Sequence, residues 1–403
     1  MGLIVQKYGG TSVADVDRVK VVAQRVIKNK EAGNDMVVVV SAPAGMTDEL
    51  IELAHEITDE PPAREMDMLL ATGEQHSIAL LAMAICNSKH CAISLTGYQA
   101  GIRTDNVHSK ARITEVQAER ITKMLDEGNI VIVAGFQGST DDDAITTLSR
   151  GGSDTSAVAL ASALEADVCE IYTDVDGVYT ADPRIVPEAK KIDTISYEEM
   201  LEMASLGAKV LHSRAVEFAG KYNVPLHVRS SFNENQGTIV TKEGEAMEGV
   251  VVRGVTHDKN QAKMSIFGVP DRPGIAYSIF KALASAEINV DMIVQTVSKN
   301  EKADISFTVS KSDLRDALEI FKKVGENIGI TDIAYDEDVA KVSVVGIGMK
   351  SHSGVAAEMF EVLAEEDINI QMISTSEIKI SCVVKTEDTE KAVKAIHRKF
   401  IPS

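Results

Sequence analysis

The sequence predicts an α/β protein in which a sandwich with a mainly parallel sheet is followed by two smaller units of ferredoxin-like βαββαβ plan. In the first half of the chain, short and nearly continuous apolar runs alternate with stretches of helical period. This alternation is typical of parallel strands whose sheet is covered by helices on both faces. In the last third, one pattern of residues occurs twice at an offset of 80 residues, which separates Gly274 from Gly354 and indicates two copies of one unit.

Within the sandwich, the expected strands and helices follow one another in alternation. Apolar runs predict strands at residues 3–5, 36–40, 91–95, 130–133 and 168–172. Helical periodicity predicts helices at 16–30 and 65–85. A polar segment with several Asn and Gly residues, 231–249, then marks a linker.

The repeated units each read strand, turn, helix, strand, strand, helix. The first copy starts at Met264 and the second at Val342. The first copy also has a candidate fourth strand at 330–335, and the second copy has none. We therefore expect the strand-like segment 249–255 to complete the second sheet, so that the first copy is inserted within the second. The predicted domains are 1–245, 263–338, and 246–262 together with 339–403.

Composition narrows the class of protein. The 403 residues include 41 Lys and Arg against 61 Asp and Glu, which gives a formal net charge of −20. Such a charge repels phosphate backbones and anionic lipid head groups, so general nucleic-acid or membrane binding is not expected. Contents of 44% hydrophobic and 25% charged residues are those of a globular protein, which favours a small-molecule enzyme.

The cysteines and the N-terminus give no sign of secretion. The four cysteines contain no CxxC pair, and we expect all of them to be small buried hydrophobic residues: Cys86, Cys91, Cys169 and Cys382. No run of about 18 uninterrupted apolar residues occurs, and polar residues interrupt the first apolar run too early for a signal peptide. We expect a soluble, unprocessed, cytoplasmic protein without a dedicated metal site.

A first candidate phosphate site follows the N-terminal strand, where the sequence Lys7-Tyr8-Gly9-Gly10-Thr11-Ser12 leads into a helix. Two glycines allow backbone N–H groups to approach a phosphate, and the start of the helix adds positive partial charge. Lys7 supplies a mobile cation. The spacing matches neither Walker A nor GxGxxG, and because a strand, a Gly-Gly turn and a helix often follow one another for structural reasons, both interpretations stay open.

A second candidate segment is TLSRGGSDTSA at 147–157. A helix capped by Ser153 or Asp154 explains part of this pattern. Arg150 adds a group suited to bidentate carboxylate binding, which a cap does not need.

A third cluster, YTDVDGVYTADPR at 172–184, follows a predicted strand. An acidic turn is the simpler interpretation, and a calcium loop is disfavoured because the Gly and Glu of an EF-hand are missing. A loop after the carboxyl end of a strand is also where α/β sheets bind nucleotides.

Six motifs occur in an order that is typical of one family. KYGGTS, VVVVSAPAGMTDEL, ATGEQHS, TLSRGGSDTSA, YTDVDGVYTADPR and GAKVLHSRA closely resemble aspartate kinases of the amino-acid kinase superfamily, and the repeated units resemble ACT domains, which are small-ligand regulatory modules. The resemblance covers essentially the whole chain. It implies an amino-acid-kinase-type three-layer sandwich with tandem ACT domains. It also implies that MgATP phosphorylates the side-chain carboxylate of L-aspartate to 4-phospho-L-aspartate, at the entry to lysine, threonine and methionine biosynthesis.

The resemblance implies roles for individual residues. Lys7 is implied to neutralise the transferring γ-phosphoryl group, Asp154 to orient catalytic groups, and Lys209 to act as a second cation near the phosphates. The implied ATP contacts are Lys7, Gly9, Gly10, Ser41, Thr173, Asp174, Tyr179, Asp182, Pro183, Arg184 and Lys209. The implied aspartate contacts are Ser41, Thr47, Glu74, Arg150, Gly151, Gly152 and Ser153. His212 is expected to pack or cap a helix, because the attacking carboxylate is already ionised at pH 7 and needs no base.

The ACT resemblance implies an effector site in the first copy. The implied contacts are Asp271, Gly274, Ile275, Ala276, Asn289, Val290, Asp291, Met292 and Gln295. The second copy replaces Asp271 with Ser351 and Asp291 with Gln371, so the first copy is the better candidate for binding an amino acid, lysine or threonine. We also expect a homo-oligomer joined through the ACT domains, with a shorter ACT-only subunit as a further possible partner.

Two other functions remain as alternatives at this stage. One is another amino-acid kinase, such as an N-acetylglutamate or glutamate 5-kinase, which the double ACT tail and the 172–184 loop disfavour. The other is an amino-acid sensor with an inactive kinase fold. The presence of Lys7, Glu74, Arg150 and Asp154 argues against the sensor.

Overall fold

The computed structural model describes residues 2–149, 151–208, 210–242, 251–297, 302–350 and 352–401. The chain divides into two compact units. The first unit comprises Met1–Val178, Lys191–Ser205 and Lys209–Ala246, and the second comprises Tyr179–Lys190, Leu206–Ala208 and Met247–Ser403. The segment Tyr179–Lys190 therefore packs with the C-terminal part of the chain, although both of its sequence neighbours belong to the first unit.

The first unit is built on an eight-stranded sheet of order β12-β14-β13-β9-β1-β2-β6-β3. Its strands are β1 (Leu3–Tyr8), β2 (Asp35–Val40), β3 (Ala92–Leu95), β6 (Ile130–Ala134), β9 (Val168–Thr173), β12 (Thr194–Ser196), β13 (Leu226–Ser230) and β14 (Thr238–Thr241). The pairings reported between these strands are parallel except for that of β13 with β14. The predicted parallel sheet is confirmed, and each of its five predicted strands forms. Strand β14 lies within the predicted linker 231–249, so that prediction is wrong at residues 238–241.

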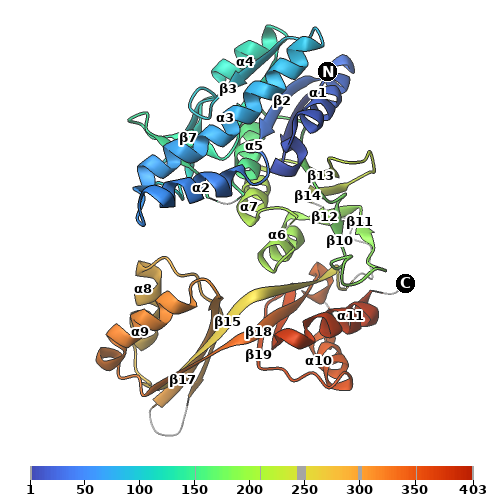
Figure 1. Cartoon of the computed structure of the whole chain (residues 1–403). Coiled ribbons are helices and arrows are strands. Elements are labelled where there is room, and N and C mark those ends of the chain that lie inside the picture. The colour runs from blue at the N-terminus through green and yellow to red at the C-terminus, as the bar shows by residue number, and fades with distance from the viewer. Residues whose placement is uncertain are drawn as a thin grey trace. The chain divides into compact units, whose positions relative to one another are not determined.

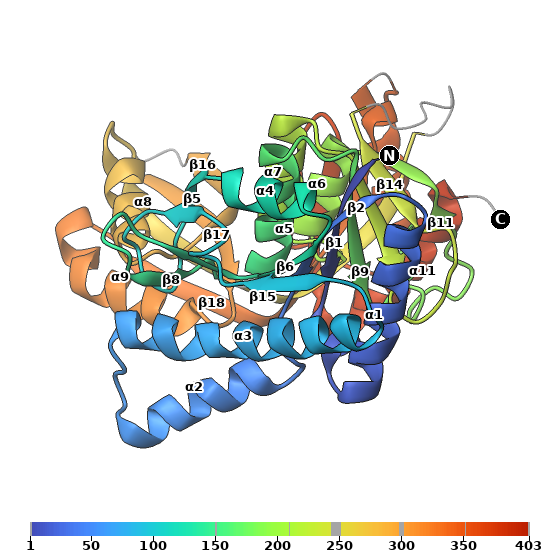
Figure 2. The same cartoon turned by 90° about the horizontal axis from the view of Figure 1, so that it is seen from above.

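Helices cover both faces of this sheet (Figure 2). They are α1 (Val16–Glu31), α2 (Met46–Ile57), α3 (Ala63–Asn87), α4 (Glu119–Asp126), α5 (Gly152–Ala163), α6 (Tyr197–Ser205) and α7 (Ser213–Tyr222). On one face, α1 and α3 pack on apolar side chains of β1, β2 and β6. On the other face, α5 contacts β1, β2 and β9, and its small Ala and Ser residues let it lie buried between the sheet and α7.

The sequence did not predict the first unit's second sheet, which has the order β5-β4-β7-β8. Its strands are β4 (Ile102–Thr104), β5 (Ile113–Val116), β7 (Gln137–Ser139) and β8 (Ile145–Thr147). Each strand has only three or four residues, so no period-2 pattern can emerge from so short a run. A two-stranded sheet is formed by β10 (Val178–Tyr179) and β11 (Lys191–Ile192).

The second unit is built on an antiparallel six-stranded sheet of order β16-β17-β15-β18-β20-β19. Its strands are β15 (Gly254–Pro270), β16 (Asp291–Val297), β17 (Lys302–Ser310), β18 (Asp332–Val345), β19 (Met372–Thr375) and β20 (Lys379–Lys385). Its helices are α8 (Ile275–Ser285), α9 (Leu314–Ile328), α10 (Val355–Glu365) and α11 (Thr389–Phe400). This content matches two βαββαβ repeats: repeat 1 is the copy that starts at Met264, and repeat 2 is the copy that starts at Val342.

Two long strands, β15 and β18, are shared by both repeats, as Figure 1 shows. The end of β15, from Lys263 to Phe267, pairs with the start of β18 in repeat 1. The start of β15, from Gly254 to Asp258, pairs with Lys341–Val345 at the end of β18 in repeat 2. Strand β15 therefore takes part in both repeats, and the insertion of the first repeat within the second stays a prediction. The strand begins at Gly254, later than the predicted segment 249–255, of which residues 249 and 250 lie outside the described residues.

The cysteine prediction is wrong for two of the four residues. Cys169 and Cys382 are buried, and burial raises the pKa of both thiols, to about 12 for Cys382. Cys86 and Cys91 are exposed, because they lie where α3 ends and β3 begins. All four are free thiols.

One described helix, α3, is long and apolar enough to cross a membrane by length and composition. Its buried residues include the carboxylates of Asp67 and Glu74, and Ile78, Leu81 and Ile85 belong to the core under the sheet. Packing within the first unit therefore accounts for part of the apolar character of α3, of whose most apolar window 39% is buried.

Candidate active site

The centre of the candidate site is an ion pair between Lys7 and Asp154. Lys7 lies near the carboxyl end of β1, and Asp154 lies in the first turn of α5. The Lys7 Nζ is 2.7 Å from the Asp154 Oδ1, and the side chains are only 12% and 10% exposed. Two residues that the sequence separates widely thus lie together at the carboxyl end of β1.

The Gly9-Gly10 turn packs directly against the turn that follows β2. A Cβ on Gly10 would lie 2.7 Å from the carbonyl oxygen of Ala42, so only glycine fits there. The N–H of Ser41 donates to the carbonyl of Tyr8, and the N–H of Ala44 donates to that of Gly10. The carboxyl ends of β1 and β2 therefore form one continuous surface, the place where parallel sheets of this kind bind nucleotides.

Glu74 is buried beside this surface. Its Oε1 accepts a hydrogen bond from the N–H of Ala42 at 3.1 Å, and its Oε2 has no partner among the described residues. The residue is 3% exposed, and burial raises its pKa to about 7 despite the hydrogen bond from Ala42. The neighbouring Gly73 makes this approach possible, since a Cβ there would lie 2.7 Å from the Cβ of Ala42. A carboxylate in this state is suited to bind a cationic group of a ligand.

The segment before α5 has a strained backbone. Ser149 and Gly151 both have positive φ, 70° and 73°. A Cβ on Gly151 would lie 2.2 Å from the ring of His212, so glycine is required. Ser153 is buried beside Gly135, just after β6. Arg150, the implied carboxylate-binding residue, lies outside the described residues.

His212 has the packing role expected from the sequence. It occupies the N-cap position of α7, but its side chain makes no cap hydrogen bond. Its ring lies against Gly151, and burial lowers its pKa. The imidazole is therefore held neutral at pH 7.

The implied ATP contacts after β9 are divided between the two units. Thr173 ends β9, and its hydroxyl donates to the carboxylate of the exposed Asp174 at 3.0 Å. Tyr179, Asp182, Pro183 and Arg184 belong to the second unit. The Arg184 guanidinium donates hydrogen bonds to both carboxylate oxygens of Asp182 and lowers the pKa of that carboxyl. Lys209 lies outside the described residues, and Thr47 lies in the first turn of α2.

Sequence reasoning missed Asp67, a buried carboxylate on α3. It accepts hydrogen bonds from the Ser109 N–H and from the Thr147 hydroxyl, and its Oδ2 lies 2.7 Å from Nδ1 of His108. Thr147 is the last residue of β8 and lies two residues before Ser149, where the backbone first takes a positive φ. The sequence feature that could have revealed Asp67 is its spacing from Glu74, because residues seven positions apart lie on one face of a helix.

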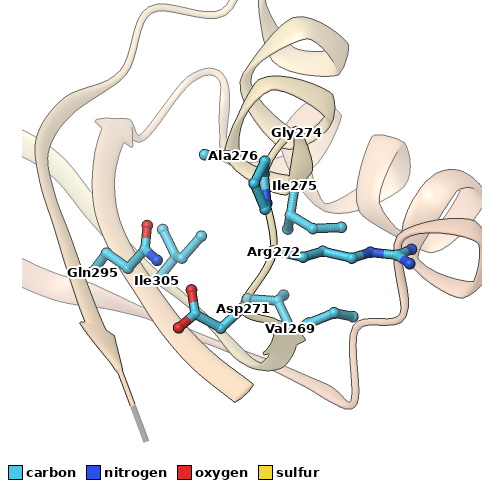
Figure 3. Close-up of a pocket in the computed structure, with 10 residues that line it drawn as sticks. Val269, Asp271, Arg272, Gly274, Ile275, Ala276, Gln295 and Ile305 are labelled. Atoms are coloured by element: carbon cyan, nitrogen blue, oxygen red, sulfur yellow. The ribbon is translucent and has the colours of Figure 1, made fainter. Parts of the chain in front are cut away.

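A separate pocket of about 340 Å³ lies in repeat 1 (Figure 3). Five of the implied effector contacts line it: Asp271, Gly274, Ile275, Ala276 and Gln295. The other four, Asn289, Val290, Asp291 and Met292, are not among its lining residues. Figure 3 shows the Asp271 carboxylate and the Gln295 amide on one side of the loop, and Arg272 extending to the other.

The carboxylate of Asp291 instead contacts a lysine of repeat 2. The Asp291 Oδ2 lies 2.5 Å from the Nζ of Lys341, a residue that is 2% exposed. Lys263, which occupies the corresponding place in repeat 1, donates to Gln371 at 3.2 Å. The two repeats thus make equivalent cross-contacts to a lysine of the other repeat, one from the carboxylate of Asp291 and one from the uncharged amide of Gln371. Ser351, the counterpart of Asp271, lies outside the described residues.

Among the described residues, no three His, Cys, Asp or Glu side chains gather closely enough to hold a metal ion. The groups at the carboxyl end of β1 suit an anion: the Lys7 ammonium and the backbone of the Gly-Gly turn, which leads into a four-residue 3-10 helix, Gly10–Val13. Positive charge and N–H donors of this kind are what the phosphates of a nucleoside triphosphate require.

Comparison with known proteins agrees with this geometry. The model of the amino acid kinase family matches residues 2–230, and that of the ACT domain matches 264–324 and 342–400. The fold and the site therefore define a kinase of the amino acid kinase family with two ACT repeats.

Relatives that match along the whole length define the group more narrowly. The aspartokinase of Pseudomonas aeruginosa is 54% identical over 402 residues, covering 99% of this chain and 98% of that protein. That of Corynebacterium glutamicum is 53% identical over 405 residues, covering 99% and 96%. The crystal structure of E. coli aspartokinase III with aspartate and ADP, in its R-state, has a TM-score of 0.83 at 28% identity and covers 98% of this chain and 99% of that one. The chain belongs to the aspartate kinases, ATP-dependent enzymes of the amino acid kinase family.

Proposed function

We propose that the first unit transfers the γ-phosphoryl group of MgATP to the side-chain carboxylate of L-aspartate, giving 4-phospho-L-aspartate and ADP. The observation that carries this proposal is that the Lys7–Asp154 ion pair and Glu74 lie at the carboxyl ends of β1 and β2. Only one of the two Glu74 carboxylate oxygens has a hydrogen-bond partner among the described residues. A carboxylate oxygen of aspartate attacks the γ-phosphorus, and the bond from that phosphorus to the ADP oxygen breaks. The step needs no base, because the attacking carboxylate is ionised.

The residues of the chain position the reactants and neutralise charge. Lys7 faces the transferring group, and Asp154 holds the Lys7 ammonium in place. Glu74 accepts the α-ammonium of aspartate at its unpaired oxygen, while Arg150, Ser41, Thr47, Gly151, Gly152 and Ser153 form the rest of the aspartate site. Phosphoryl transfer depends mainly on such positioning and charge stabilisation. Mg²⁺ enters with the nucleotide, whose phosphate oxygens are the ligands it prefers.

The ATP site is formed by Lys7, Gly9, Gly10, Ser41, Thr173, Asp174, Tyr179, Asp182, Pro183, Arg184 and Lys209. Support comes from E. coli aspartokinase III, whose crystal structure contains aspartate and ADP. The reaction is the first step of lysine, threonine and methionine biosynthesis, in the cytoplasm.

Feedback regulation is assigned to the ACT repeats, with lysine, threonine or both as effectors, and the repeat 1 pocket is the candidate effector site. Its Asp271 carboxylate is suited to an effector's ammonium group. A crystal structure of E. coli aspartokinase III with lysine and aspartate, in its T-state, matches this chain with a TM-score of 0.77 at 29% identity and covers 99% of each chain. The ACT repeats also join copies of the chain, with a shorter ACT-only subunit as a second partner.

A coupled assay of ADP release tests the reaction. MgATP is supplied with L-aspartate, L-glutamate or N-acetyl-L-glutamate in turn. We expect ADP release above background only with L-aspartate. ADP release with L-glutamate or N-acetyl-L-glutamate that equals the release with L-aspartate contradicts the proposed substrate.

A further inference from the structure

The segment Tyr179–Lys190 is part of the hydrophobic core of repeat 2. Its buried residues Ala181, Ile185 and Val186 belong to the same cluster as Leu363 and other core residues of α10, α11 and the sheet. All three are at most 9% exposed. The segment is therefore packed as an element of the second unit and is not a free loop.

Hydrogen bonds fix the same segment to repeat 2. The Val255 N–H donates to the carbonyl of Thr180 at 2.7 Å. The Thr180 hydroxyl is hydrogen-bonded to Nε2 of His397, on α11, at 2.9 Å, and it accepts from the Lys190 N–H at 2.9 Å. Both Thr180 and His397 are buried, and burial lowers the pKa of the imidazole, so the contact joins neutral groups at pH 7.

The buried residues Ile185 and Val186 share one tight turn with Asp182 and Arg184, which are proposed ATP contacts. The N–H groups of Ile185 and Val186 both donate to the carbonyl of Asp182, at 3.0 and 2.9 Å. Arg184 lies in the same turn and pairs with the Asp182 carboxylate. Any displacement of Ile185 or Val186 in the core therefore moves Asp182 as well.

Repeat 1 lacks such an attachment among the described residues. Its core cluster runs from Ala262 to Ile333 and contains only its own helices and strands. The two repeats share one architecture, but only the core of repeat 2 extends to a segment that carries ATP contacts.

We propose that repeat 2 is a positioning element for the nucleotide, with Thr180, His397 and the core around α11 holding Tyr179, Asp182 and Arg184 in their binding arrangement. This inference rests on the proposed ATP contacts of those residues. The buried residues act through the turn and do not touch the nucleotide. Repacking of the repeat 2 core therefore changes affinity for ATP and leaves affinity for aspartate unchanged.

A matched pair of substitutions separates this role from general damage to the regulatory unit. Leu283 and Leu363 occupy equivalent positions in the two repeats, and both are fully buried. Each of Leu283→Ala and Leu363→Ala creates a similar cavity in its own repeat. We expect Leu363→Ala to weaken MgADP binding about tenfold in titration calorimetry, within the range seen for residues that touch neither ligand. Leu283→Ala should leave MgADP binding within about twofold of the wild type.

A milder pair guards against failure of Leu363→Ala to fold. Thr180→Val keeps the shape and removes the hydroxyl that contacts His397 and Lys190. Thr180→Ser keeps the hydroxyl. We expect Thr180→Val to raise the KM for ATP with an unchanged KM for aspartate, and Thr180→Ser to behave as the wild type.

Hydrogen exchange of the peptide 179–190 gives a readout that does not depend on the nucleotide. Exchange should rise in Leu363→Ala and not in Leu283→Ala. If exchange rises while the wild type binds no MgADP, the packing role holds and the proposed ATP site fails. If the wild type binds MgADP and Leu363→Ala and Thr180→Val bind it equally well, the positioning role is overturned.

Discussion

The two candidate binding regions differ in how they hold charge. At the carboxyl ends of the strands of the first unit, the side chains of Lys7 and Asp154 are only 12% and 10% exposed, Glu74 is 3% exposed, and one Glu74 oxygen has no partner among the described residues. At the repeat 1 pocket, the carboxylate of Asp271 is exposed to solvent. Charges interact far more strongly away from water, and holding them there is costly. The difference indicates that the first region is organised to stabilise charge during a reaction, and that the second is organised to bind a ligand.

The largest effect is expected at the buried cation. Lys7→Ala removes the charge that balances the transferring phosphoryl group and leaves Asp154 without its 2.7 Å partner. Loss of one such electrostatic contact costs roughly 3 kcal/mol, so kcat should fall by about two orders of magnitude while the KM for ATP changes less. Steady-state kinetics measure this, with Lys20→Ala on the exposed face of α1 as the control. A near-normal kcat would place Lys7 outside the reaction.

Substitution of Glu74 tests whether the pKa that burial raises controls the binding of aspartate. In the free enzyme its pKa is about 7, so the carboxyl is neutral below that pH and cannot attract the ammonium of aspartate. We expect kcat/KM for aspartate to fall as the pH drops below about 7. Glu74→Gln should lower it by roughly 10- to 100-fold at pH 8, since a charged hydrogen bond contributes about 1.5–3 kcal/mol. It should also abolish this part of the pH profile.

Glu49→Gln, at an exposed position of α2, is the control for Glu74. It should keep both the rate and the pH profile of the wild type. A Glu74→Gln profile that still falls below pH 7 would assign the titration to another group.

The second unit also contains a buried charge, Lys341, and a pair of substitutions around it sharpens the comparison. Asp291→Ala leaves Lys341 buried without its partner, whereas Gln371→Ala removes only the neutral counterpart. Loss of a partner from a fully buried ion pair costs several kcal/mol, and the partial exposure of Asp291 reduces this to about 1–3 kcal/mol. Gln371→Ala should cost about 1 kcal/mol or less. Denaturant unfolding of the two variants measures the difference.

The Asp291 pair also has a defined pH dependence. Burial alone would raise the pKa of Asp291, but the hydrogen bond and the charge of Lys341 outweigh it and hold the pKa below the usual 3.8. The stabilisation is therefore fully present above about pH 4 and is lost as the pH falls through the lower pKa of the folded state. Equal stability loss in Asp291→Ala at pH 3 and pH 7 would contradict this.

The smallest effect is expected at the exposed pocket. Asp271→Ala should raise the half-inhibitory concentration of lysine or threonine only about three- to tenfold, because water screens an exposed charge. The uninhibited rate should not change. Asp316→Ala, an exposed carboxylate on α9 of the same repeat, should alter neither quantity. If Asp271→Ala leaves inhibition intact, the effector binds elsewhere.

The sequence predicted those features that leave a pattern in neighbouring residues. Apolar runs located the central strands, and Gly-Gly turns located the segments around Lys7 and Asp154. No local pattern could show that Asp67 supports Thr147, because that contact joins residues 80 positions apart. The packing of Ile185 and Val186 into repeat 2 was equally hidden, since scattered apolar residues in a turn have no period.

Strand β15 has a consequence for the order of events during synthesis on the ribosome. Its first residues, Gly254–Asp258, pair with Lys341–Val345, which are translated much later. At 5–20 residues per second, roughly 4 to 17 s pass between the two. During that interval the newly made chain exposes a strand edge whose partner does not yet exist, and the core that holds Ile185 and Val186 is also incomplete. Until Lys341–Val345 have been made, this unpaired strand edge can pair with another chain.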